Sequence, residues 1–379
     1  MSSSTQQLSA RKVPLLDLKS LHEPLREEIL AEIVRVVDSQ SFIMGEDVAR
    51  LEKAIAAYCH VPYASACASG TDALYLALLA LGIQHGDRVL TTPFTFFATA
   101  GAIVRAGAIP VFADIDPITF NLAPESVRET LRHHPEVKVI IPVHLFGGSA
   151  DMDPLLEMAR ERGLAVIEDA AQAIGAEYKG RRVMTMGDVG CLSFFPSKNL
   201  GAFGDAGMVT ALNDDLAGRL AALRVHGSLK KYYHEWVGIN SRMDSLQAAV
   251  LRVKFKYLDA ETGGRQKNAA RYCDLLQGAP VNPPVIPAYQ SRHVYNQFVI
   301  RCPRRDELKA YLAQNGISTE VYYPLSLSLQ KCFAGLGYRE GDFPESERAS
   351  REVLALPVHS ALPPADQEYV AGCIQRFYA

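Results

Sequence analysis

The feature that most constrains the fold is an alternation of short apolar segments with longer amphipathic or Ala- and Leu-rich segments after residue 62. The short apolar runs predict buried strands, and the longer segments predict helices. The expected strands cover residues 63–67, 88–91, 109–112, 137–143 and 164–167, and the expected helices cover 71–81, 96–105, 124–132 and 154–162. Repeated strand–helix units with uniformly apolar strands predict a mostly parallel sheet with helices on both faces.

The segments on either side of this alternation predict a second, smaller unit. The large unit gains helices at 24–37, 46–58, 214–223 and 242–259 and strands at 174–178, 189–195 and 207–210. After Gly263-Gly264 the composition shifts to a proline-rich loop, followed by strands at 293–301 and 319–323 and helices at 305–314, 345–354 and 364–376. We therefore expect a large α/β domain at 1–260, with the N-terminal helices, and an α+β domain at 261–379.

Composition narrows the functional classes. The 379-residue chain has a net charge of -3, which gives no electrostatic argument for nucleic acid or an anionic membrane. The longest apolar run, 73–83, is shorter than the roughly 20 residues that cross a bilayer. Residues 1–7 lack the basic start and apolar core of a secretory signal. The seven cysteines are scattered without a CxxC pair, so we expect reduced thiols, a cytoplasmic location and no zinc site.

Lys198 is the first candidate functional residue. It follows an apolar run, 191–195, and precedes Gly201, Gly204 and Gly207, which permit tight backbone turns. Most lysines are solvated surface charges, but a lysine between a buried strand and a glycine-rich turn fits a desolvated pocket. Burial there lowers the pKa of the ammonium and makes the neutral amine a nucleophile.

A carboxylate and an amide follow another predicted strand. Asp169 stands at the carboxyl end of the strand expected at 164–167, where open α/β sheets bind ligands. Its alternative role is the N-cap of a following helix. Gln172 could donate a hydrogen bond to a ring oxygen of a cofactor, or it could be a partly exposed helical side chain.

The stretch 68–74 resembles a phosphate-binding helix start. A strand ends, Gly70 turns the chain and Thr71 begins a helix, so free main-chain N–H groups and the helix dipole would face an anion. Ser193 can add a hydroxyl group. The stretch is neither a GxxxxGK[ST] loop nor a GxGxxG fingerprint, which disfavours ATP and nicotinamide enzymes.

Two further groups complete the set of candidates. Phe96 follows the strand expected at 88–91 and could stack on an aromatic ring, or it could belong to the core. Asn240 and Arg242 precede the helix expected at 242–259. Arg242 could bind a carboxylate with two hydrogen bonds, or it could be a solvated charge.

The candidates together point to pyridoxal phosphate (PLP). PLP chemistry needs a lysine for an imine, a carboxylate facing the pyridine nitrogen and an anion site for the phosphate. The lysine, carboxylate, phosphate site and aromatic ring each follow a predicted strand. Carboxyl ends of parallel strands meet at one edge of a sheet, so this placement favours a single PLP site.

At this point the sequence resembles the DegT/DnrJ/EryC1/StrS family of nucleotide-sugar aminotransferases, which belong to PLP fold type I. The resemblance spans essentially the whole chain and is strongest at 69–74, 86–89, 95–99, 168–172, 193–207 and 240–247. It implies a large domain with a mostly parallel seven-stranded sheet between layers of helices, and a smaller α+β C-terminal domain.

The resemblance also implies roles for individual residues. Lys198 looks like the imine lysine and acid/base, Asp169 like the pyridinium partner, Gln172 like the ring-oxygen contact and Phe96 like the stacking ring. Gly70, Thr71 and Ser193 look like the phosphate site. Asn240 resembles an asparagine that reaches a phosphate across a dimer interface, so a homodimer with shared active sites is implied.

The implied reaction moves an amino group from L-glutamate, which leaves as 2-oxoglutarate, to a keto group of a nucleotide-linked hexose. Related sugar 3-dehydratases have histidine in place of Lys198, so lysine favours transamination. The stretches 14–19, 42–45, 142–147 and 150–153 look more like C-3 than C-4 aminotransferases. The product would be an amino sugar for a polysaccharide, lipopolysaccharide or glycosylated metabolite.

Contacts to the sugar nucleotide are less defined. The loop 224–233, with His226 and Tyr233, could face the substrate or be plain surface, and Arg242 and Tyr322 are further candidates. Ser326 and Ser328 replace a proline and a histidine that family members often carry. A PLP-binding regulatory protein without turnover stays an alternative, although an intact Lys198–Asp169 pair argues against it.

Overall fold

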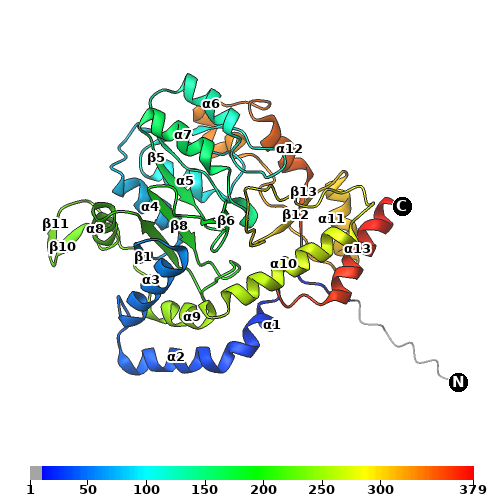
Figure 1. Cartoon of the computed structure of the whole chain (residues 1–379), viewed down its shortest axis with the longest axis horizontal. Helices are drawn as coiled ribbons and strands as arrows, with labels where there is room; N and C mark the ends of the chain where they lie inside the picture. The colour runs from blue at the N-terminus through cyan, green and yellow to red at the C-terminus, as the bar shows by residue number, and fades with distance from the viewer. Residues whose placement is uncertain (1–10) are drawn as a thin grey trace.

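The computed structural model describes residues 11–379 and is built on a central sheet of seven strands (Figure 1). In spatial order the strands are β1 (Tyr63–Cys67), β9 (Gly207–Ala211), β8 (Val189–Ser193), β5 (Ala165–Asp169), β4 (Val137–Ile140), β2 (Arg88–Thr91) and β3 (Ile109–Phe112). Only β9 runs antiparallel to its neighbours β1 and β8. The expected mostly parallel sheet is therefore confirmed.

Helices cover both faces of this sheet because its strands are apolar on both faces. In β5, Ile167 packs with α4 (Gly70–Ala80), α5 (Ala98–Arg105) and α8 (Asp214–Leu223). Its neighbour Val166 points the other way, into a core with α6 (Pro124–His133) and α7 (Met152–Arg162). On that second face α3 (Glu46–Cys59) and α9 (Ser245–Phe255) complete the layer. Buried parallel strands need this double covering.

The C-terminal unit has its own core. Strands β12 (Phe298–Arg301) and β13 (Val353–Leu356) pair antiparallel and pack against α11 (Arg305–Gln314), α13 (Pro364–Tyr378) and the second half of α10 (Leu258–Leu275). Helix α10 runs from the large unit to α13 (Figure 1). Because α10 passes through residue 260 without a break, the domain boundary near that position stays a prediction.

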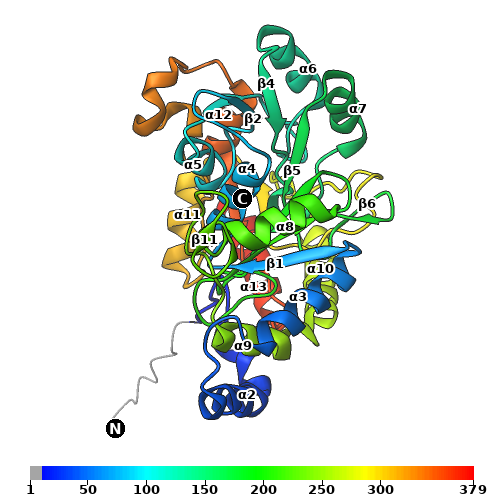
Figure 2. The same ribbon diagram turned by 90° about the vertical axis from the view of Figure 1, so that its left-hand side faces the viewer.

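The N-terminal helices and a small hairpin lie outside the two cores. Helix α1 (Leu18–His22) leads through a 3₁₀ turn, Glu23–Leu25, into α2 (Arg26–Ser39), which lies beneath α9. Figure 2 looks onto the β1 edge of the sheet, with α8 above β1 and α2 at the bottom. The hairpin of β10 (Ser228–Lys230) and β11 (Tyr233–His234) extends from this side (Figure 1). No helix within residues 11–379 is long and apolar enough to cross a bilayer.

Four expected elements of the C-terminal half differ from the structure. In the strand expected at 293–301, only residues 298–301 form β12. The strand expected at 319–323 is wrong: only Glu320 bridges to Ala355, and Tyr323 has a φ of 60°, which breaks an extended chain. The end of the helix expected at 345–354 belongs instead to β13, because α12 (Pro344–Glu352) stops where Val353 pairs with Arg301. The long helix expected at 242–259 is divided into α9 and α10.

Three expected strands of the large unit are shorter than predicted, among them the one expected at 189–195, because β8 ends at Ser193. The segment 174–178 contains only β6 (Glu177–Tyr178), which pairs with β7 (Arg181–Arg182), because Gly175 has a φ of 83°. The strand expected at 137–143 ends at Ile140, and Val143 alone pairs further on, with Asp169. This last pair brings the loop after β4 to the carboxyl end of β5.

Candidate functional site

Asp169 ends β5 as a buried carboxylate, and no cation within residues 11–379 bonds to it. Its Oδ2 accepts a hydrogen bond from Thr99 Oγ1 at 2.8 Å, and its Oδ1 accepts the Ala171 N–H at 3.2 Å. Burial raises the pKa of the carboxyl despite these bonds and the nearby charge of Lys198. Residues 170–176 form turns, so the N-cap alternative is wrong. A pyridinium N–H would supply the missing counter-charge.

Gln172 is held in one orientation by two partners. Its Oε1 accepts the Phe146 N–H at 2.7 Å, and its Nε2 donates to the Tyr323 hydroxyl at 2.8 Å. Phe146 and Tyr323 both have left-handed backbones, with φ of 57° and 60°, and their rings stack at 6.1 Å. Strained backbones of this kind cluster at functional sites. One N–H of the Gln172 amide stays available for an oxygen of a cofactor ring.

The predicted phosphate site forms where β8 meets the start of α4. Ser69 caps this helix by accepting the Asp72 N–H at 3.1 Å. A Cβ at Gly70 would lie 2.7 Å from the Ser193 Cβ, so only glycine lets the two segments approach this closely. The N-terminal N–H groups of α4, at Gly70 and Thr71, thus lie beside the Ser193 side chain. This donor set fits a phosphate.

Lys198 lies in the turn that follows β8, where its N–H donates to the Phe195 carbonyl at 2.8 Å. Its side chain is half-buried. Burial lowers the pKa of the ammonium to about 8, and the charge of Asp169 acts in the opposite direction. A neutral amine is therefore accessible near neutral pH, and Asp169 is close enough for the two charges to interact. The lysine, the carboxylate and the anion site fit PLP.

Phe96 is 62% exposed, so its alternative role in the core is wrong. It precedes α5, next to Phe97, whose ring stacks on Phe333 at 5.5 Å. An exposed aromatic ring at the carboxyl edge of the sheet is available to a ligand.

The residues predicted to contact the substrate do not gather in one place. His226 and Tyr233 are exposed around the β10–β11 hairpin, and so is Asn240, which was predicted to reach a phosphate rather than the substrate. Arg242 is half-buried, and its buried Nε has no hydrogen-bond partner within residues 11–379. Tyr322 instead lies beside Phe146, with ring centroids 6.2 Å apart. Tyr322 thus packs in a hydrophobic cluster away from the hairpin.

Ser326 and Ser328 are buried rather than directed at a substrate. Their hydroxyl groups lie 2.8 Å apart, within hydrogen-bond distance, and the intervening Leu327 N–H donates to the Pro93 carbonyl at 2.8 Å. The main chain of Leu327 therefore ties this turn to the segment after β2, and the two serines bond each other within it. Any contacts to a keto-sugar substrate would therefore come from other side chains.

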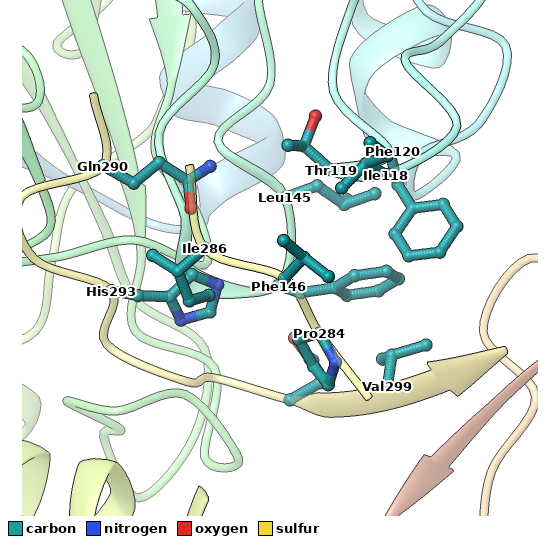
Figure 3. A pocket seen from close by; sticks show the side chains of 12 residues that line it. Ile118, Thr119, Phe120, Leu145, Phe146, Pro284, Ile286, Gln290, His293 and Val299 are labelled. Carbon is teal, nitrogen blue, oxygen red and sulfur yellow. The ribbon is translucent and has the colours of Figure 1, made fainter. Parts of the chain in front are cut away.

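A separate cavity lies behind Phe146, between the two cores (Figure 3). Leu145, Phe146 and Phe120 line it from the large unit, and Ile286 and Val299 line it from the C-terminal unit. It is mostly apolar and contains none of the predicted site residues. Phe146 thus forms a wall between this cavity and Gln172.

Sequence reasoning missed the groups that orient Asp169 and Gln172. Thr99 lies one turn beyond Thr95, whose Oγ1 is 3.3 Å from the Thr99 Oγ1, within the stretch that carries Phe96. The hydroxyl side chain of Thr99 was the sequence feature that could have indicated a hydrogen bond to Asp169. Tyr323 is 151 residues from Gln172 in sequence, and no local pattern predicts that contact.

Sequence reasoning also missed the buried pair of His144 and Glu168. Glu168 accepts N–H groups of Met184, Met186 and Gly187 at 2.7–2.8 Å, and it bonds His144 Nε2 at 2.9 Å. Burial would raise the pKa of this carboxyl, but the bonds from His144 and the main chain outweigh burial and lower it. The main-chain N–H of His144 donates a hydrogen bond to the main-chain carbonyl of Asp169 at 2.9 Å. The pair therefore fixes the end of β5.

Comparisons with known proteins agree with this geometry. The model of the DegT/DnrJ/EryC1/StrS aminotransferase family matches residues 23–375. A pleiotropic regulatory protein of Geobacillus stearothermophilus is 50% identical over 97% of this chain and 98% of its own. The UDP-N-acetyl-3-dehydro-alpha-D-glucosamine 3-aminotransferase of Acidithiobacillus ferrooxidans is 42% identical over 96% of this chain and 97% of its own.

Solved structures show the same fold. The S. venezuelae protein DesV, in complex with a ketimine intermediate, superposes with a TM-score of 0.94 and 41% identity over 97% of this chain and 98% of its own. The Bacillus subtilis protein NtdA, with bound cofactor PMP, has a TM-score of 0.89 and 31% identity over 96% of this chain and 85% of its own.

Proposed function

Because the chain belongs to the DegT/DnrJ/EryC1/StrS aminotransferase family, we propose that it is a PLP-dependent transaminase that moves an amino group from L-glutamate to a keto group of a nucleotide-linked hexose. The observation that carries this proposal is the Lys198 amine, with its lowered pKa, in one site with the buried Asp169 carboxylate. Its product would be an amino sugar for a polysaccharide, a lipopolysaccharide or a glycosylated metabolite.

Each side chain of the site has a defined task. PLP, when bound, withdraws electrons from the substrate carbon that bears the amine. Lys198 Nζ holds the cofactor and then carries the proton to and from that carbon. Asp169, aimed by Thr99, keeps a negative charge opposite the ring nitrogen. Gln172 directs an N–H at the ring oxygen, Phe96 covers the ring, and Gly70, Thr71 and Ser193 bind the phosphate.

We favour C-3 of the sugar as the aminated carbon. The Acidithiobacillus relative is named a 3-aminotransferase, and a Streptomyces venezuelae relative at 42% identity is named dTDP-3-amino-3,4,6-trideoxy-alpha-D-glucose transaminase. The deciding experiment is reverse transamination on a panel of nucleotide-linked 3-amino and 4-amino hexoses, followed by product mass. Turnover of only the 4-amino sugars would overturn the C-3 assignment.

A PLP-binding regulator is the second candidate, because the relative at 50% identity is named a regulatory protein. The two functions separate in a single-turnover experiment with excess glutamate, followed by absorbance. An aminotransferase converts its cofactor to the pyridoxamine form, whereas a regulator without turnover shows no spectral change.

We further propose that the protein is a cytoplasmic homodimer. All seven cysteines lie within the described chain, and none forms a disulfide, as in a reducing compartment. Large apolar side chains are exposed on α2, on the segment after it and around the hairpin. They are Leu30, Val34, Val37, Phe42, Ile43, Met44, Leu229, Tyr232, Tyr233, Trp236 and Val237. A second copy that covers them would bring Asn240 to the partner's phosphate site.

A further inference from the structure

A cavity beside Lys198 contains a second lysine that the proposed roles leave unused. The N-terminal segment around α1 and the junction of α9 and α10 form its walls. Apart from one tyrosine, the titratable groups that line the cavity are His22, Lys198, Lys254, Glu261 and Arg265. Lys254 and Arg265 thus open onto the same space as the reactive amine.

Lys254 is a half-buried cation with neutral partners. Its Nζ donates to the Gly201 carbonyl and lies 2.9 Å from His22 Nε2. Burial, and then the charge of Lys254, lower the pKa of His22 to about 4, so the imidazole is a neutral acceptor. Burial also lowers the pKa of Lys254 to about 8. An ammonium has three N–H donors, so one remains for a further acceptor.

The neighbouring Lys256 shows how an ordinary lysine behaves in this region. It is exposed and forms an ion pair with Glu28. Lys254, by contrast, has no carboxylate within ion-pair distance in the described part of the chain. The charge of Glu261 acts on Lys254 from beyond ion-pair distance and does not offset the effect of burial on its pKa, so a bound anion in contact with Lys254 would lower the free-energy cost of its burial.

The remaining charges in the cavity also favour an anion. Arg265 is buried, and its Nη1 donates to the main-chain carbonyls of Tyr295, Asn296 and Val358. The one carboxylate, Glu261, accepts a hydrogen bond from the Ser360 hydroxyl. Even without Lys198, the two cations Lys254 and Arg265 outnumber Glu261 at pH values below the pKa of Lys254, about 8, so the cavity then has an excess of positive charge.

We propose that this cavity binds a carboxylate of the amino-acid donor, and that Lys254 is the ammonium that pairs with it. The inference rests on the proposed aminotransferase function and adds a donor subsite to it. The amine of the donor has to reach Lys198, and a carboxylate on Lys254 would place the donor in the space that both lysines line. Charge-assisted pairs of this kind supply both affinity and orientation.

The test uses the full-length holoenzyme with Lys254→Met, which removes the charge and keeps the length of the side chain. Lys256→Met is the matched control from the exposed side of the same region. Calorimetry measures the dissociation constant of maleate, a dicarboxylate that cannot react. Rapid-mixing absorbance measures the two half-reactions, one with glutamate and one with a nucleotide-linked amino sugar.

We expect Lys254→Met to raise the maleate dissociation constant and the KM for glutamate by about tenfold or more, as for a lost charge-assisted hydrogen bond. The KM for the amino sugar should not change, and Lys256→Met should alter neither half-reaction. Lys254→Arg keeps the charge and should retain maleate binding. This variant still tests the inference if Lys254→Met does not fold.

Equal losses in both half-reactions would overturn the inference, because they would show that Lys254 only holds the Gly201 turn. An unchanged maleate affinity in Lys254→Met would overturn it too. If the wild-type protein shows no spectral change with glutamate, the proposed aminotransferase function fails instead, and the maleate measurement still tests the cavity.

Discussion

Lys198 and Asp169 have pKa values displaced in opposite directions, and burial is the main cause for both. The amine moves toward its neutral form, and the carboxyl toward its protonated form, so neither charge is fully satisfied by the protein alone. A cofactor with a cationic ring nitrogen and a carbonyl carbon would satisfy both groups at once.

The lowered pKa of Lys198 predicts how cofactor uptake depends on pH. Only the neutral amine attacks a carbonyl, so the rate of PLP attachment to the apoprotein should rise with pH and level off above about 8. An ordinary lysine would level off only above its usual 10.5. Stopped-flow absorbance of apoprotein with PLP measures this profile, and a rate that keeps rising toward 10.5 would contradict it.

Thr99 gives a second prediction at the residue scale. Thr99→Val keeps the shape of the side chain but removes the hydrogen bond to Asp169 Oδ2. The glutamate half-reaction should slow by about 10- to 100-fold, since a hydrogen bond to a charged group contributes about 1.5–3 kcal/mol. Thr95→Val is the matched control, because Thr95 contacts the Thr99 hydroxyl and not the carboxylate. Equal effects of the two variants would rule out this role.

At the scale of elements, the end of β5 depends on the His144–Glu168 pair. Glu168→Gln would turn an NH₂ group toward main-chain N–H donors that now bond a carboxylate oxygen. We expect the free energy of unfolding to fall by about 3 kcal/mol, because buried donors lose their acceptor. Urea denaturation measures the loss. Glu157→Gln, on the exposed side of α7, is the control and should leave stability unchanged.

Sequence predicts elements well where the apolar pattern is local. Five elements have the bounds expected from sequence, because each is a short periodic run between turn residues. They are β1, β2, β3, α8 and α11. Strand β13 was missed because its pairing with β12 joins residues more than 50 positions apart. The strand expected at 319–323 contains Thr319 and Glu320 and is less apolar than β13, so tertiary pairing with β12, not the local pattern, selects β13.

The same division holds for the site. The positions of Lys198, Asp169, Gln172 and Gly70 after strands could be predicted from sequence, because each follows a short apolar run, whereas their roles stay predictions. The orientation of these groups could not be found, since it comes from partners in other elements. The substrate-facing candidates around the hairpin stay predictions, because none of them lines the cavity beside Lys198.

At the scale of the whole molecule, the exposed apolar side chains predict an obligatory pair of subunits. Mixed dimers test whether the sites are shared. Lys198→Ala and Asn240→Ala subunits should each have little activity alone. If Asn240 serves the partner's site, mixing the two variants restores one intact site per mixed dimer, and activity returns. Recovery in proportion to mixed dimers, measured by glutamate turnover, is the expected result; no recovery would place Asn240 in its own subunit's site.

The hydrogen bond between Gln172 and Tyr323 joins the large unit to a C-terminal segment that packs in a hydrophobic cluster shared by both units. Gln172 stands in the large unit at the proposed ring-oxygen contact, and Tyr323 belongs to the segment between α11 and α12. With Gln172 at the proposed ring-oxygen contact, we expect cofactor binding and the docking of that segment to be coupled, and the coupling would be reciprocal. The C-terminal unit would then contribute to the retention of a ligand that it need not touch, and the ligand would stabilise the unit's docking in return.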